Sequence, residues 1–584
     1  MIKIIKKVSR LFNKIQIARL ILLVVLMVIG AFLEVLGVGL MVPFVSVLFE
    51  DDVLSEYRII GDACQRVGIT SAKQFTIVCV VALIVIFVVK DIYLIWEERL
   101  QLNFVYENRF RTQKLVLKAY LQKPYEFYLN ANTGEVTRAV CDDVNQAYLV
   151  VTTVLSMLTN IVMSVALTIT IFVISPGMTI AVLLSIVIAV LIISLVVKPI
   201  LSREGRNRMT ASSNANMWLI QSVQGIKEIK VSQAGEYFLE SYSKYGKALI
   251  KAEKTNALWG TAPKRIIEMI TISSVLLVLV TMILYGTEMQ DMVPFLGALA
   301  MAAVRLLPSA NIIMLAINQI TYHEKALDTL LENLKEFESV RDAEGSELQK
   351  ADSIMFSKEV CLTDVVYRYP GYDKKILNGA SVVIPKGLSV GIVGESGSGK
   401  TTMIDVLLGL LTIETGNVFV DGKNIQDSYQ SWLKCVGYIP QSIFLIDDTI
   451  KENVMFGKDY GPENDKYVEM ALEKAQLMEF VNGLPDGFAT KIGDRGVRLS
   501  GGQRQRIGIA RALFSDPDIL VFDEATSALD NETEEAIMES LNRLHGEKTM
   551  IIIAHRLTTL KECDLIYQVK NGKATVISKE ELGI

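Results

Sequence analysis

The chain has 584 residues, of which 51% are hydrophobic, and its mean hydropathy is +0.36. This is too apolar for an ordinary soluble protein, and the apolar excess lies in the first 320 residues, so we expect a membrane part followed by a soluble part. The net charge of -5 argues against a polyanionic partner such as nucleic acid, and the cysteines lack the spacing of a disulfide framework or a zinc site.

Residues 1–16 mix basic and apolar side chains. The cations of this segment are Lys3, Lys6, Lys7, Arg10 and Lys14. A basic amphipathic pattern of this kind is typical of a helix on an anionic membrane surface, so we expect a cytosolic N-terminus. The apolar run that follows is too long for a signal peptide and lacks a small-residue cleavage site, which indicates a first membrane span.

Six apolar runs are long enough to cross a bilayer as helices, given roughly 20 residues per crossing. They lie at about 17–49, 75–96, 149–174, 178–198, 266–286 and 292–320. An even number of crossings returns the chain to the cytosol, and the basic loops 97–148 and 199–265 agree with that orientation. Both loops have a helical pattern, so we expect long cytosolic hairpins whose turns, near Pro124 to Ala131 and Met209 to Gln221, reach the soluble domain.

The sequence thus divides into an amphipathic segment (1–16), an all-α transmembrane domain (17–320), a linker (321–351) and a soluble domain (352–584). The linker carries many charges of both signs, which predicts a solvated helix followed by a loop. Between spans one and two, Val53 to Val67 is expected to form a short external helix.

A glycine-rich segment lies near the start of the soluble domain. It fits the pattern GxxxxGK[ST] in full and reads Gly394, Glu395, Ser396, Gly397, Ser398, Gly399, Lys400 and Thr401. An apolar, β-rich run precedes it and a predicted helix from Thr402 follows, which is the context that the motif requires. We expect these residues to hold the phosphates of a nucleoside triphosphate, with Lys400 as a positive charge and the Thr401 hydroxyl on Mg²⁺.

Two further motifs follow downstream. Small residues again precede a helix at Ser500, Gly501, Gly502 and Gln503, which predicts a second anion cradle. A buried strand at 519–522 then ends in Asp523 and Glu524. Asp523 is suited to hold Mg²⁺ through water and Glu524 to polarise the attacking water, because phosphoryl transfer depends mainly on positioning and charge neutralisation.

The order of these three motifs resembles the ATP-binding cassette (ABC) family, and the resemblance covers residues 355–580. It implies an α/β P-loop domain in which Tyr369 stacks on adenine, Gln441 of a Q-loop senses the transmembrane part and reaches Mg²⁺, Asp530 forms a D-loop, and His555 contacts the γ-phosphate. Thr490 to Gly496 resembles the exporter-type segment before the signature, with Lys491 and Ile492 as departures. His323 and His545 are expected to be structural.

The resemblance also implies an assembly and an activity. Ser500 and Gly502 of one chain would close over ATP bound at Lys400 of a second copy, giving a homodimer that uses ATP and Mg²⁺. Lys400, Gln441, Glu524 and His555 would carry the hydrolysis. A membrane domain before the cassette resembles the exporter branch, whose members need no soluble binding protein.

Three cations within the spans, Lys90, Lys264 and Arg305, lie at similar depth by residue count, near Glu34. Intramembrane charges are typical of function or of pairing, so they either bind an anionic headgroup such as a lipid pyrophosphate or form internal ion pairs with Asp91, Glu34 and Glu268. The stretch 304–311 and the external helix resemble bacterial flippases of polyprenyl-pyrophosphate-linked oligosaccharides. This favours a lipid-linked oligosaccharide flippase in a bacterial plasma membrane; the alternative is an exporter of other lipids, hydrophobic drugs or peptides.

Overall fold

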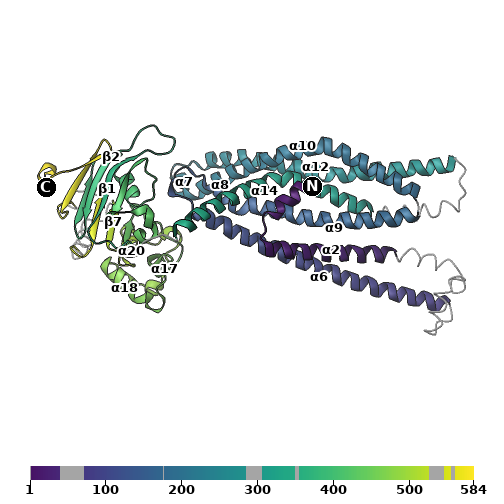
Figure 1. The fold of residues 1–584 in the computed structure, drawn as a ribbon, viewed down its shortest axis with the longest axis horizontal. Coiled ribbons are helices and arrows are strands. Elements are labelled where there is room, and N and C mark those ends of the chain that lie inside the picture. The colour runs from purple at the N-terminus through teal and green to yellow at the C-terminus, as the bar shows by residue number, and fades with distance from the viewer. Residues whose placement is uncertain are drawn as a thin grey trace. The chain divides into compact units, whose positions relative to one another are not determined.

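The computed structural model describes residues 2–39, 72–174, 176–284, 306–348, 354–524, 545–553 and 560–583. The chain divides into two compact units (Figure 1). The first contains Met1–Lys123 and Ala131–Val340, and the second contains Pro124–Asn130 and Arg341–Ile584. The expected external helix at 53–67 lies outside the described residues.

The first unit consists of helices. They are α1 (Ile2–Ser9), α2 (Lys14–Gly39), α6 (Ala72–Leu121), α8 (Thr133–Thr137), the π-helical turn η1 (Arg138–Asp143), α9 (Val144–Ile174), α10 (Pro176–Gln224), α11 (Ile226–Val231), α12 (Gly235–Leu284) and α14 (Leu307–Leu348). The helices α6 and α12 have 50 residues each, and α10, which runs beside α12 in Figure 1, has 49. At 1.5 Å per residue they are roughly 75 Å long, well beyond a hydrocarbon core of about 30 Å.

Among the described residues, two helical stretches are long and apolar enough to cross a membrane by length and composition, namely Lys14–Glu34 and Thr133–Ile169. The bent pair Leu183–Ile193 and Leu195–Gln224 is a third if it forms one span. These stretches overlap the runs expected at 17–49, 149–174 and 178–198.

The turn expected near Met209 to Gln221 does not lie where the sequence suggested. Helix α10 continues without a break through Met209–Gln221 and ends at Gln224. The chain reverses around α11 instead, between Gly225 and Gly235, where Gln233 has a φ of 55°. The expected position was wrong because residues 209–221 contain neither glycine nor proline, so nothing there interrupts the helix.

The stretch expected to begin the linker is helical, as predicted, but one of its faces is buried. Helix α14 runs through the expected boundary at 320/321, and its face formed by Tyr322, Ala326, Leu327, Leu330 and Leu331 is buried. The charged residues between 321 and 335 lie on the other side of this helix, which is therefore amphipathic over that stretch.

The N-terminal helix α1 packs on the first unit. Its apolar residues Ile4 and Val8 are buried, and the Lys7 Nζ lies 2.6 Å from a Glu324 carboxylate oxygen and 2.8 Å from one of Asp328, both on α14. The remaining cations of the segment are exposed. Part of the apolar side of this helix, Ile4 and Val8, therefore contacts protein, whereas Ile5 is exposed.

Two glycines allow helices of the first unit to approach closely. A Cβ on Gly205 of α10 would lie 2.1 Å from the Tyr322 carbonyl oxygen of α14, and one on Gly134 of α8 would lie 2.7 Å from the Ser213 carbonyl oxygen of α10. A methyl group cannot occupy either space, so these contacts require glycine.

The second unit contains two sheets. The antiparallel sheet has the order β2 (Leu377–Pro385), β1 (Glu359–Tyr367), β4 (Thr415–Val420), β5 (Lys423–Asn424). The other sheet has the order β10 (Lys573–Val576), β9 (Leu565–Lys570), β3 (Ser389–Val393), β8 (Thr549–Ile553), β7 (Ile519–Asp523), β6 (Val436–Ile439). Strands β3, β7 and β8 are parallel and buried at every residue, as their continuous apolar sequences predict.

Helices surround these sheets. They are α7 (Tyr125–Asn130), α15 (Lys400–Leu407), α16 (Tyr429–Lys434), α17 (Ile450–Met455), α18 (Asn464–Lys474), α19 (Met478–Asn482) and α20 (Gly501–Leu513), with short 3₁₀ turns η3 (Ile425–Ser428), η4 (Gly461–Glu463), η5 (Gly487–Ala489), η6 (Asp494–Gly496) and η7 (Glu580–Leu582). Trp432 of α16 is fully buried and its indole N–H donates to the Leu407 carbonyl at 3.1 Å, which joins α16 to the end of α15.

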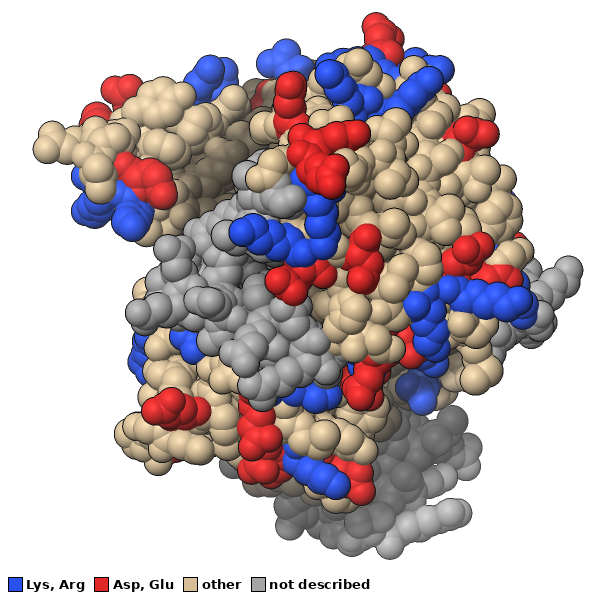
Figure 2. Space-filling model, turned by 90° about the vertical axis from the view of Figure 1, so that its left-hand side faces the viewer, with Lys and Arg blue, Asp and Glu red and all other residues tan. Residues whose placement is uncertain are grey.

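Side chains of both signs are intermingled on the face drawn in Figure 2. Basic and acidic groups alternate over the part of this face that the structure describes, without gathering into a broad single-sign surface.

Candidate functional site

The glycine-rich loop joins β3 to α15. Strand β3 ends at Val393, and Gly394 and Gly399 have φ values of 156° and 104°, a region that side-chain-bearing residues rarely adopt. A Cβ on Gly394 would lie 2.5 Å from the Val569 carbonyl oxygen, so the loop also packs closely against β9. The glycines therefore allow a compact loop at the N-terminal end of α15, as the motif predicts.

The Lys400 side chain lies within this loop and only 6% of the residue is exposed. Its Nζ donates to the carbonyl oxygens of Gly394 (3.0 Å) and Glu395 (3.1 Å). The ammonium group is thus fixed beside the loop whose N–H groups are expected to bind phosphate, where it adds a positive charge.

Asp523 ends β7 and is 5% exposed. The Tyr438 hydroxyl donates to its Oδ2 at 3.3 Å, and a hydrogen bond joins Asp523 to the Thr401 side chain. Burial raises the pKa of Asp523, and the Tyr438 contact opposes that shift. On α15, burial followed by the charge of Asp523 raises the pKa of Asp405 to about 6. Two carboxyl groups therefore share a poorly solvated region behind the phosphate loop.

Glu524 and Gln441 meet at the edge of the sheet. Strands β6 and β7 are parallel neighbours, and Ile439 pairs with Phe522. Gln441 lies two residues after Ile439 and Glu524 two residues after Phe522, so the two side chains come from the same end of neighbouring strands. The Gln441 Nε2 donates to the Glu524 Oε2 at 2.7 Å. Glu524 has a φ of 52°, an uncommon backbone conformation for glutamate that is often found at functional sites.

The second expected anion cradle is the N-terminus of α20. Ser500 is its N-cap; the Ser500 Oγ accepts from the Gln503 N–H at 3.2 Å, and the Gln503 side chain accepts from the Ser500 N–H at 2.8 Å. This is a capping box, which fixes how the helix begins. Gly501 and Gly502 form the first turn, where backbone N–H groups point away from the helix.

Tyr369 and α7 contact the phosphate-binding helix and the residues that follow it. The Tyr369 hydroxyl is 3.1 Å from the Thr402 Oγ1, which ties the residue expected to stack on adenine to the phosphate-binding helix. The Glu126 carboxylate of α7 accepts from the Thr412 N–H at 2.7 Å. The first hairpin turn therefore belongs to the second unit, as Pro124 to Ala131 was expected to.

The oxygen donors next to Lys400 suit Mg²⁺. Thr401 and Asp523 are hydrogen-bonded to each other, so a hydroxyl and one carboxylate are already side by side. Among the described residues, no group of three or more His, Cys, Asp and Glu side chains is arranged so that it could hold a metal ion by itself. Mg²⁺ is commonly held by one or two carboxylates together with substrate phosphates and water, and this donor set fits that pattern.

Several predicted site residues lie elsewhere or outside the described ranges. Asp530, His555 and Arg305 are among the latter. Lys90 is buried, with its Nζ 3.1 Å from an Asp91 carboxylate oxygen and over the Phe87 ring. The Lys264 side chain is 58% exposed, with its Nζ 4.0 Å from a Glu268 carboxylate oxygen. Both ion pairs, Lys90 with Asp91 and Lys264 with Glu268, are among those that the sequence analysis gave as the alternative to headgroup binding.

The remaining sequence details have structural explanations. Ile492, a departure in the exporter-type segment, is 1% exposed in the core of the second unit, and Lys491 pairs through its backbone with Thr449. His545 contacts the Asp564 carboxylate at 2.9 Å, and His323 lies 3.1 Å from the Gln319 side-chain oxygen.

Sequence reasoning missed Tyr438, Asp405 and Glu126. Tyr438 precedes Gln441 by three residues and Asp405 follows Lys400 by five, so proximity to the motifs was the only available signal.

Comparisons with known proteins agree with this arrangement. The family model described as "ABC transporter transmembrane region" matches residues 20–296, and "ABC transporter" matches residues 377–527. A solved structure of a bacterial Atm1-family ABC exporter with ATP bound superimposes with a TM-score of 0.76 over 98% of this chain and 96% of that one, at 21% identity. That likeness establishes the fold.

Similar curated proteins include ATP-dependent lipid A-core flippases. The Vibrio cholerae protein is 38% identical over 241 residues, which is 41% of this chain and 40% of that protein. The Francisella tularensis protein is 28% identical over 485 residues, 81% of this chain and 77% of that protein. "ABC transporter B family member 6" of Dictyostelium discoideum is 39% identical over 217 residues, 36% of this chain and 32% of that protein. The match thus spans less than half of the Vibrio and Dictyostelium proteins.

Proposed function

The chain belongs to the ABC transporter family, whose members are ATPases coupled to transmembrane transport, and from this we propose a cargo, a direction and an assembly. The protein is a homodimer that flips a lipid-linked oligosaccharide, a polyprenyl-pyrophosphate glycan, from the cytosolic to the outer side of a bacterial plasma membrane. The alternative is export of other lipids, hydrophobic drugs or peptides.

The observation that supports ATP-driven work is the grouping of Lys400, Asp523, Glu524 and Gln441 in one unit. In the proposed reaction, the Glu524 carboxylate accepts a hydrogen bond from a water molecule that attacks the γ-phosphorus, and the bond from that phosphorus to the ADP oxygen breaks. Lys400 balances charge on the β/γ phosphates. Mg²⁺ held by Thr401 and Asp523 would supply further charge neutralisation there.

Gln441 has a place in the same proposal. Its amide donates to the Glu524 carboxylate at 2.7 Å, which restricts the orientation of that carboxylate. Since the water must lie against Glu524 for attack, the Gln441 contact is one that the ATP-bound site would have to accommodate or replace. A protein that uses ATP only for gating does not need a carboxylate that activates water. The presence of Glu524 therefore favours a protein that hydrolyses ATP repeatedly.

The observation that supports a lipid cargo is the similarity to proteins named lipid A-core flippases, one of them across 81% of this chain. The cations support an anionic headgroup. Lys90 is buried against Asp91, whereas Lys264 has a largely exposed side chain and a carboxylate only at the limit of ion-pair distance. Of these two cations, Lys264 is therefore the better placed for a headgroup.

Reconstituted protein tests the cargo. Polyprenyl-pyrophosphate glycans in the liposome should stimulate ATP hydrolysis and be flipped, and Lys264→Ala should reduce that stimulation while basal hydrolysis persists. Arg265→Ala is the matched control, because Arg265 is 83% exposed and contacts the same Glu268. A response to peptides or drugs with none to pyrophosphate lipids would replace the proposal by its alternative.

A further inference from the structure

The segment that follows Gln441 is packed against the helix that Ser500 begins. Ile443 fills the space beside Gly508 in the middle of α20, where a Cβ would lie 2.4 Å from the Ile443 Cδ1. Gln441 belongs to the expected Q-loop, and Ser500 begins the second anion cradle. The contact between Ile443 and α20 therefore connects these two motifs.

Arg511, near the C-terminal end of α20, strengthens this connection. Its Nη1 donates to the Phe444 carbonyl at 2.9 Å and its Nε to the Asn453 carbonyl at 2.9 Å. The guanidinium carbon lies 4.0 Å from the centre of the Phe456 ring. One side chain thus contacts the segment after Gln441, Asn453 within α17 and Phe456, the residue that follows α17.

Asn453 completes the connection. It is fully buried, its Oδ1 accepts from the Ile446 N–H at 2.9 Å, and its Nδ2 donates to the carbonyl oxygens of Ile446 and Thr449 at 3.0 Å each. The Arg511 Nη2 also reaches the Asn453 Oδ1, at 3.4 Å. Every polar group of this buried amide is used, which makes the connection stiff.

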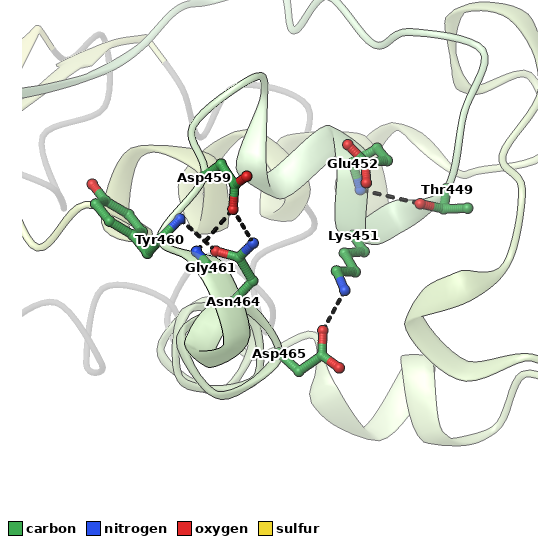
Figure 3. A network of polar contacts seen from close by, with 8 residues as sticks. All are labelled: Thr449, Lys451, Glu452, Asp459, Tyr460, Gly461, Asn464 and Asp465. Carbon is green, nitrogen blue, oxygen red and sulfur yellow. Dashed lines mark hydrogen bonds and ion pairs between the residues drawn. The ribbon is translucent and has the colours of Figure 1, made fainter.

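Further contacts tie the neighbouring helices to this connection. Figure 3 shows α17 tied to the start of α18 by the Lys451–Asp465 ion pair, while the Asp459 carboxylate accepts from the Gly461 N–H and the Asn464 amide at 2.8 and 2.7 Å. At the start of α17, the Thr449 hydroxyl accepts from the Glu452 N–H. Helices α17, α18 and α20 therefore behave as one block that is fastened to residues 443–446.

The surroundings of Arg511 indicate that its side chain fixes the positions of neighbouring groups rather than stabilising the fold. Its acceptors are carbonyl and amide oxygens, all uncharged, and burial lowers its pKa to about 10. A charge removed from water toward uncharged partners costs free energy that an apolar side chain would avoid. The planar fork, however, can hold three acceptors in fixed directions, which lysine cannot.

We propose that Arg511 is a positioning residue that transmits movement of Gln441 at one ATP site to Ser500, which completes the other ATP site of the dimer. Ser500 lies eleven residues before Arg511, which is roughly 16 Å along a helix at 1.5 Å per residue. A rotation of about 10° at the Arg511 end would displace Ser500 by roughly 3 Å, enough to make or break its hydrogen bonds to phosphate. Binding at one site thereby changes the affinity of the other. This inference rests on the proposed two-chain ATPase but not on its cargo.

The test measures basal ATP hydrolysis by the full-length dimer as a function of ATP concentration, without a transported lipid. The wild type should give a Hill coefficient above 1, and Arg511→Lys, which keeps the charge and loses the fork, should reduce it to about 1. Arg506→Lys is the matched control, because Arg506 lies on the same helix and donates to the Gln476 carbonyl instead of the segment after Gln441. It should retain the wild-type coefficient.

A milder variant guards against misfolding. Phe456→Leu removes the ring beneath Arg511 and leaves its hydrogen bonds, so it should lower the Hill coefficient partway at an unchanged thermal midpoint. An unaltered coefficient in both Arg511→Lys and Phe456→Leu, an equal loss in Arg506→Lys, or a wild-type coefficient of 1 would overturn the inference while leaving the ATPase intact. A wild type that does not hydrolyse ATP would overturn both.

Discussion

Replacing Asp405 by asparagine should change how stability depends on pH. Asp405 is 9% exposed, and burial followed by the charge of Asp523 raises its pKa to about 6 from an ordinary value of 3.8. Burial raises the pKa values of Tyr125 of α7 and Tyr438, and the nearby Asp405 charge adds to both shifts. The folded protein therefore binds a proton at Asp405 more tightly than the unfolded chain does.

The sign of the effect follows from this difference. A carboxyl group with a raised folded pKa stabilises the protein below its unfolded pKa, and that contribution is lost as the pH rises through about 6. A shift of about two pH units corresponds to roughly 3 kcal/mol at 1.36 kcal/mol per unit. Asparagine has a similar shape and does not titrate, so Asp405→Asn should gain on the wild type by about this amount between pH 4 and pH 7.

Thermal unfolding of the detergent-solubilised full chain at pH 4.5, 6 and 7.5 would measure the gain. Asp421→Asn is a control of opposite sign. Burial raises the pKa of Asp421, but hydrogen bonds from the backbone of Glu359, Ser357 and Lys358 outweigh it and lower the pKa. That variant should be less stable than the wild type at neutral pH, and the deficit should shrink as the pH falls. Parallel melting curves for wild type and Asp405→Asn across the range would refute the reasoning.

Two further substitutions test contacts away from Asp405. Gly205→Ala places a methyl group 2.1 Å from the Tyr322 carbonyl oxygen, so thermal unfolding should show destabilisation by about 1–3 kcal/mol, whereas Gly246→Ala, which meets nothing within 4 Å, should be neutral or slightly stabilising. Glu126→Ala removes the acceptor of the Thr412 N–H, so cargo should stimulate ATP hydrolysis less while the basal rate is kept; equal loss of both rates would argue against a coupling contact.

The ATP-binding half was predictable because its information is local. The loop from Gly394 to Thr401 carries its own conformation in its glycines, and a buried strand ending in Asp523 and Glu524 can be read without knowing its neighbours. The contact between Gln441 and Glu524 depends instead on β6 lying beside β7 in parallel register, which separate sequence motifs do not encode.

The same distinction explains the errors. The charges of 321–351 were read as solvation because the burial of Leu327 and Leu330 depends on what α14 packs against. The turn was expected at Met209 to Gln221, within a loop of helical pattern, whereas the chain reverses between the glycines at 225 and 235. Arg511 gave no signal at all, because the backbone and side-chain oxygens that accept its hydrogen bonds are brought to it only by folding.

Glu524→Gln provides the most direct test of the proposed ATP-driven dimer. The variant, purified and supplied with Mg²⁺ and labelled ATP, should hold unhydrolysed ATP in a stable two-chain complex at one nucleotide per chain and should flip no lipid. Hydrolysis at the wild-type rate by that variant, or full-speed hydrolysis by a wild-type protein that remains monomeric, would contradict the account.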